Sequence, residues 1–133
     1  MFIARLPLEK QETFLNLAYT MVYADGRLDE REQLIFAGYQ IESEVDMSKV
    51  HKVDFEKELK KLDDCTEIEK QCVFMELYAI ALIDESYPEE EKVLVEATKK
   101  RFNISDEKMS AMNDAFKNFT DAYKKLHAVV TTE

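Results

Sequence analysis

The feature that most constrains the fold is the scarcity of turn-forming residues, since glycine and proline each occur only twice in 133 residues. A sheet protein of this length needs many tight turns, and Gly and Pro are the strongest signals for them. Ala, Leu, Glu and Lys recur instead at helical spacings of three and four residues. The sequence therefore predicts an all-α protein, with one domain expected over residues 1–133.

About six helices are expected, or seven if the last one is split. The first runs from Leu8 to Ala24 after Pro7, and the second follows Asp29. A loop over Glu42–Val53 leads to a short helix near Asp54–Leu62. A buried helix opens at Thr66, which forms a capping box with Glu69. Two more are expected, one ending near Asn103 and one capped by Ser105.

Charge and hydropathy exclude several classes of function. The chain carries 28 acidic and 18 basic residues, a net charge of −10, so it repels a phosphate backbone and nucleic-acid binding is not expected. The longest apolar stretch, CVFMELYAIALI, is interrupted by Glu76 and is too short to span a membrane, so no membrane insertion is expected. The opening MFIARLPLEK lacks the apolar region of a secretory leader, which predicts a cytoplasmic location.

The stretch YADGRLDERE interrupts the helical pattern with one of the two glycines, and a similar device occurs later in the chain. Gly26 suits the residue after a helix end, because it adopts a left-handed backbone without steric cost. We call residues 25–32 the first elbow and residues 84–91 the second elbow, where Glu85 occupies the place of the glycine. Superposing the two elbows aligns similar residues: Asp25 with Asp84, Glu32 with Glu91, Tyr19 with Tyr78, and Leu28 with Tyr87.

These two stretches resemble the signature of the tellurite-resistance TerB-like domain family. In that family, Ala-x-x-Asp-Gly-x-apolar-x-x-x-Glu occurs in two helix–elbow–helix units, which AYTMVYADGRLDEREQLIF and AIALIDESYPEEEKVLV resemble here. The likeness covers roughly Leu8 to Ser105. It implies a TerB-like helical bundle and a connection with tellurite resistance or stress response. It also implies an acidic surface, proposed in the family to bind metal ions.

Carboxylate oxygens are the ligands that hard divalent cations prefer. The predicted metal ligands are therefore Asp25, Glu32, Asp84 and Glu91, with Asp29, Glu30, Glu89 and Glu90 at the rim. Calcium or magnesium is the expected cation. Two carboxylates per elbow fall short of the ligand number of calcium, so carbonyls and water would complete each site, or the two elbows would share their acids.

Helix capping is an alternative reading of the same acids, because Glu32 follows Asp29 at the spacing of a capping box. Acidic residues in a first helical turn also interact favourably with the helix dipole. Glu91 is explained less well in this way: if Ser86 caps the helix, the capping-box position is Glu89 and Glu91 lies deeper.

Catalysis is not expected, since His51 and His127 are isolated and no nucleophile or phosphate-loop motif occurs. The predicted function is a non-catalytic binding module that acts on a cation or on an unidentified protein partner. The alternative is a metal-free interaction module that docks its partner through an apolar helix face. The Met and aromatic stripe of the last helix is expected in the core. If Phe116, Phe119 and Tyr123 are exposed, they mark a partner or dimer surface instead.

Overall fold

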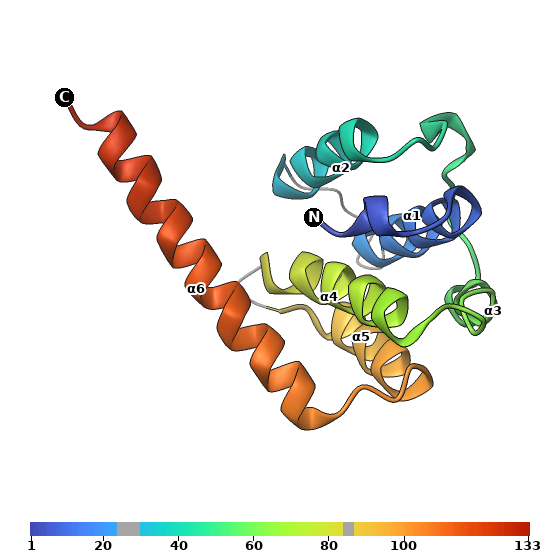
Figure 1. The fold of residues 1–133 in the computed structure, drawn as a ribbon. Coiled ribbons are helices and arrows are strands. Elements are labelled where there is room, and N and C mark those ends of the chain that lie inside the picture. Colours follow the sequence, from blue (N-terminus) through green and yellow to red (C-terminus); the bar gives the residue numbers. More distant parts are fainter. Residues whose placement is uncertain (24–29, 84–86) are drawn as a thin grey trace. The chain divides into compact units, whose positions relative to one another are not determined.

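The computed structural model describes residues 1–23, 30–83 and 87–133, and the regular structure in these ranges is entirely helical (Figure 1). The all-α prediction is confirmed for this part of the chain, which contains six α-helices. The elements are η1 (Ile3–Arg5), α1 (Leu8–Val22), α2 (Glu30–Glu42), η2 (Met47–Lys49), α3 (Phe55–Lys60), α4 (Glu67–Ile83), α5 (Glu89–Arg101) and α6 (Asp106–Thr131).

The chain forms two compact units. The first unit is Met1–Asn103 and contains α1 to α5, and the second unit is Ile104–Glu133, which consists mainly of the single long helix α6 (Figure 1). None of the described helices combines the length and the apolar character needed to cross a membrane.

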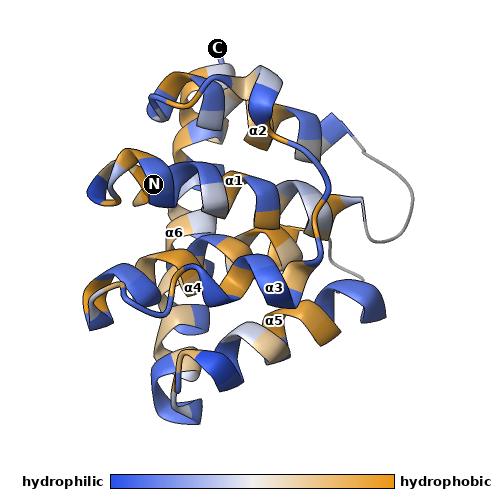
Figure 2. Cartoon of the chain, turned by 90° about the vertical axis from the view of Figure 1, so that its right-hand side faces the viewer, coloured by the Kyte–Doolittle hydropathy of each residue, from blue (hydrophilic) through white to orange (hydrophobic). Residues whose placement is uncertain are grey.

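The core of the first unit is built around α1 and α4. Helix α1 contacts α3, α4 and α5, while α4 also contacts α2, α5 and η1. Hydrophobic and hydrophilic residues alternate along these helices, as expected for amphipathic helices around a common core (Figure 2). The most buried large side chains of α1 and α4 are Phe14, Leu15, Leu17, Met21, Val22, Val73, Phe74 and Leu77.

Local capping signals in the sequence begin three of the helices. The Asp54 side chain accepts a hydrogen bond from the Lys57 amide at 3.2 Å and begins α3. Thr66 and Glu69 form the predicted capping box at α4, with reciprocal bonds of 3.1 and 2.9 Å between side chain and amide. Ser105 caps α6 by accepting from the Lys108 amide. Each cap needs only a few adjacent residues, which explains why the sequence predicts those at Thr66 and Ser105.

Three polar side chains of α1 hold the connection between α2 and α3 in place. Gln11, Asn16 and Thr20 are all buried although they lie in the central helix. Their side-chain oxygens accept hydrogen bonds from the backbone amides of the connection: Glu44 at 3.1 Å, His51 at 3.0 Å and Val53 at 3.0 Å. The amides of an irregular segment are thereby satisfied without a helix or a sheet.

Glu76 of α4 is the second buried polar anchor, with 5% of its surface exposed. One carboxylate oxygen lies 2.6 Å from both the Met1 ammonium and the Phe2 amide, and the other accepts from the Tyr39 hydroxyl at 3.2 Å. Glu76 therefore joins the N-terminus and α2 to α4. Burial is the main cause that raises the pKa of Tyr39 well above its ordinary value, and the Glu76 charge adds to it.

Candidate functional site

Most of the predicted cation ligands fall on residues whose placement is not described. Asp25, Asp84 and the rim residue Asp29 lie outside the described ranges, and so does the side chain of Glu32. Within the described residues, no group of three or more His, Cys, Asp or Glu side chains is arranged to hold a metal ion. The four-carboxylate site therefore stays a prediction.

Glu91 is the one predicted ligand whose side chain is described, and it is buried with 4% of its surface exposed. Helix α5 begins at Glu89 after Pro88, so Glu91 belongs to its first turn. Glu91 thus stands three residues after the N-cap, at the capping-box position, and not at the deeper position that a cap at Ser86 would give it. Pro88 is the N-cap of α5. Its ring fixes φ, and it has no backbone N–H that would require an acceptor at the helix start. The helix dipole therefore stabilises the Glu91 carboxylate.

Tyr87, the aromatic residue of the second elbow, is half-buried against α4. Tyr87 adopts a left-handed backbone with φ 44° and places its ring 6.4 Å from the Tyr78 ring of α4. Burial raises the pKa of Tyr87 to about 12. The Lys92 ammonium lies 5.1 Å above the same ring and 3.9 Å from the exposed carboxylate of Glu89. Tyr19, which the sequence aligns with Tyr78, has its ring centroid 6.0 Å from that of Phe36 in α2.

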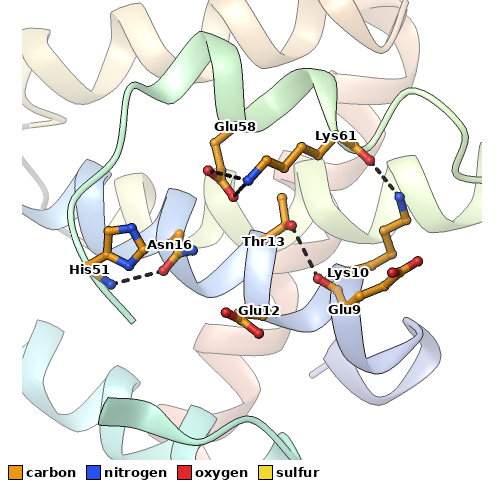
Figure 3. A pocket seen from close by; sticks show the side chains of 8 residues that line it. All are labelled: Glu9, Lys10, Glu12, Thr13, Asn16, His51, Glu58 and Lys61. Atoms are coloured by element: carbon orange, nitrogen blue, oxygen red, sulfur yellow. Dashed lines mark hydrogen bonds and ion pairs between the residues drawn. The ribbon is translucent and has the colours of Figure 1, made fainter. Parts of the chain in front are cut away.

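A polar cavity of ≈ 510 Å³ lies where α1, α3 and the connection between α2 and α3 meet (Figure 3). Its lining residues are Glu9, Lys10, Glu12, Thr13, Asn16, His51, Glu58 and Lys61. Several of its charges are already paired within the chain. Lys61 contacts the Glu58 carboxylate at 3.0 Å, and Lys10 contacts Asp64 and the Lys61 carbonyl, both at 2.6 Å. Lys10 thereby joins α1 to the segment that follows α3, and Asn16 accepts from the His51 amide of the connection, so these contacts indicate a structural use.

The apolar face of the last helix is exposed in its C-terminal half, whereas Met109, Met112 and Phe116 near its start are half-buried. The prediction that its aromatic stripe lies in the core is wrong for two residues, since Phe119 is 54% exposed and Tyr123 is 62% exposed. The helix also continues through Val129 and Val130, both 74% exposed, where fraying was expected. We call the stripe with alternating spacings of three and four residues the α6 seam: Met109, Met112, Phe116, Phe119, Tyr123, Leu126 and Val130.

The seam repeats every seven residues, with its members at the a and d positions of three heptads and a fourth a position. The sequence contained this signal, because the spacing can be read directly from residues 109–130. A periodic pattern shows which side of a helix is apolar, but it does not show what covers that side. The exposure of the seam from Phe119 to Val130 is therefore a finding of the structure.

Comparison of the chain with protein-family models, with curated proteins and with solved structures finds no match. The resemblance to TerB-like domains therefore stays a prediction.

Proposed function

We propose that this protein is a non-catalytic interaction module that binds a protein partner through the α6 seam. The observation that carries the proposal is the exposure of large apolar side chains along one side of α6, with Leu126 62% exposed besides Phe119 and Tyr123. Burying apolar surface contributes about 25 cal/mol per Å². Contiguous apolar surface of this kind marks an interaction site on a soluble protein.

A photo-crosslinking residue at Leu126 tests this function directly, because it reacts only with a surface that touches the seam. The matched control carries the same residue at Lys125, the neighbouring position on the opposite, polar side of the helix. We expect a protein adduct on irradiation in cells from position 126 and none from position 125. Absence of an adduct from both positions would contradict the proposal.

A second candidate function is divalent-cation binding by the elbows, favoured by the burial of the Glu91 carboxylate at the start of α5. Here Glu91 and Asp84 would share calcium or magnesium across the second elbow, and Asp25 and Glu32 would do so in the first. The link to tellurite resistance or stress response rests on the family resemblance alone.

Thermal unfolding of the metal-stripped protein tests the cation function. A cation that binds only the folded state at 100 times its Kd stabilises by about 2.7 kcal/mol. We expect added calcium or magnesium to raise Tm in the wild type and not in Asp25→Asn with Asp84→Asn. The matched control is Glu96→Gln, an exposed carboxylate of α5 outside the elbow, which should keep the response. A Tm that no cation changes would exclude this candidate.

A further inference from the structure

We propose that the partner of the α6 seam is a second copy of this chain, and that the two α6 helices pair antiparallel as a coiled coil. This inference rests on the proposed function and names its partner. The first argument is the length of the register. Seven seam residues with spacings of three and four continue from Met109 to Val130, and heptads sustained over three or more repeats are typical of a coiled coil.

The positions that flank the seam suit self-pairing, because from Met109 onward they carry no charge. One flank consists of Ala115, Ala122 and Val129, and the other of Asn113, Thr120 and His127. Like charges at these positions would oppose two identical helices, and charged pairs there normally select a different partner. The charged residues of this stretch lie on the outer side of the helix instead. Small alanines on one flank also permit close approach of a second helix.

Charge along α6 favours the antiparallel orientation. Residues 106–116 contain three acidic residues and one basic residue, whereas residues 117–131 contain three basic residues and one acidic residue. Antiparallel pairing places each basic half beside an acidic half, and it also opposes the two helix dipoles. One register satisfies every seam position from 109 to 126: Met109 faces Leu126 of the second copy, Met112 faces Tyr123, and Phe116 faces Phe119.

The charge of the first unit favours the same orientation. Residues 1–103 hold 23 acidic and 14 basic residues, a net charge of −9, while residues 104–133 hold five and four, a net charge of −1. Parallel helices would start side by side, with two units of charge −9 attached there. Antiparallel helices of 26 residues separate these attachment points by about 39 Å.

A membrane surface fits the same helix less well. Interfacial helices are rich in Lys and Arg on their polar face, which attracts anionic lipids. Helix α6 has four basic and four acidic residues, so it gains no net attraction to such a surface. Vesicle binding by the wild type, with no dimer in solution, would overturn the assignment to a second copy.

Light scattering and sedimentation of the full chain test the pairing. We expect a dimer in the wild type, a monomer in Phe119→Glu, and a dimer in Asn118→Glu, which places the same charge at the adjacent outer position. Circular dichroism of both variants checks that α6 remains helical. A dimer that persists in Phe119→Glu uses another surface and overturns the proposal.

A wild-type monomer would also overturn the proposal, and one further measurement then decides the fate of the proposed function. The thiol of Leu126→Cys, with Cys65→Ala and Cys72→Ala, is treated with a thiol reagent. Labelling at the rate of a free thiol would show that the seam is accessible to another protein, and the proposed function would then stand. Protection in the monomer shows that the chain covers its own seam, and both proposals fail.

Orientation is measured on the same cysteine-free background with a spin label at Thr131→Cys. Antiparallel pairing separates the two labels by about 40 Å, since 27 residues of helical rise lie between them in the register above. Parallel pairing brings them side by side at one end of the coil. A short distance between the labels would overturn the antiparallel assignment.

Discussion

Replacing Glu76 with Gln tests whether the buried carboxylate anchors the N-terminus and α2 to α4. The substitution keeps the size of the side chain and removes its charge. In the wild type the carboxylate meets three donors, of which the Met1 ammonium and the Phe2 amide lie at 2.6 Å and the Tyr39 hydroxyl at 3.2 Å. An amide side chain offers one acceptor oxygen, and its NH₂ group faces a donor in place of an acceptor.

The expected loss in unfolding free energy follows from the contacts that the substitution removes. A hydrogen bond to a charged group contributes about 1.5–3 kcal/mol. The Met1 ammonium is 42% exposed and keeps a second contact with Glu42 at 3.1 Å, so water and Glu42 compensate in part. We therefore expect a loss in the lower part of this range, about 1.5–2 kcal/mol. For a domain of this size the Tm then falls by roughly 6–8 °C.

The pH dependence gives an independent check. Burial opposes the charge of the Met1 ammonium, but its hydrogen bond and attraction to Glu76 outweigh this and raise its pKa above the ordinary 8.0. A raised amine pKa stabilises the fold fully below pH 8.0 and ceases to do so as pH rises through the folded value. The difference in unfolding free energy between wild type and Glu76→Gln should therefore shrink as pH rises above 8.0.

Chemical denaturation at a series of pH values measures this difference, with Glu42→Gln as the matched control on the more exposed carboxylate. The series ends near pH 9.0, because burial raises the pKa values of buried Cys65 and half-buried Cys72, which weaken the fold above that pH in their own right. Equal or higher stability in Glu76→Gln would show that desolvation of the carboxylate costs more than its contacts contribute. Equal stability and higher stability would each refute the role of Glu76 as an anchor for the N-terminus and α2.

Three further substitutions probe local features of the first unit. Thr66→Ala removes the cap of α4 and should cost about 0.5–2 kcal/mol in denaturant unfolding. Asn16→Ala removes the acceptor of the part-buried His51 amide, which should cost about 0.5–1.5 kcal/mol and speed hydrogen exchange at that amide. Asp63→Asn should change Tm little at neutral pH, because its ion pair with Arg101 is exposed. The Arg101 hydrogen bond lowers the pKa of Asp63, so its small effect should vanish as the solution is acidified below pH 3.8.

The sequence predicted the features that depend on adjacent residues and missed those that depend on distant ones. The predicted caps at Thr66 and Ser105 each need a side chain and an amide three residues apart, and both are present. In the sequence, Glu76 is visible only as an interruption of an apolar stretch. Its partners are the Met1 ammonium and Tyr39, 37 residues away, and nothing local indicates that the fold brings them together.

In the candidate sites, too, adjacent residues indicate some features, while others depend on distant parts of the chain. The sequence leaves the start of α5 open, because Ser86 and Pro88 lie two residues apart and both suit a helix entry, and the structure begins the helix after Pro88. The polar residues of α1 did carry a signal: Gln11 and Asn16 stand inside an otherwise apolar helix, which requires buried partners for them. The α6 seam was identified as apolar, but its exposure depends on the rest of the chain and could not be predicted from its own residues.

Salt dependence provides a last test that separates the two orientations of an α6 dimer. The Debye length is about 30 Å at 0.01 M salt and about 10 Å at 0.1 M. Parallel pairing holds two first units of charge −9 near one end of the coil, so added salt should strengthen association severalfold by screening their repulsion. In the antiparallel dimer the attachment points lie about 39 Å apart. Only the weak attraction between acidic and basic halves is then screened, so the dissociation constant should change little or rise slightly. A dimer that tightens steeply with salt would therefore contradict the antiparallel pairing, even if Phe119→Glu abolishes association.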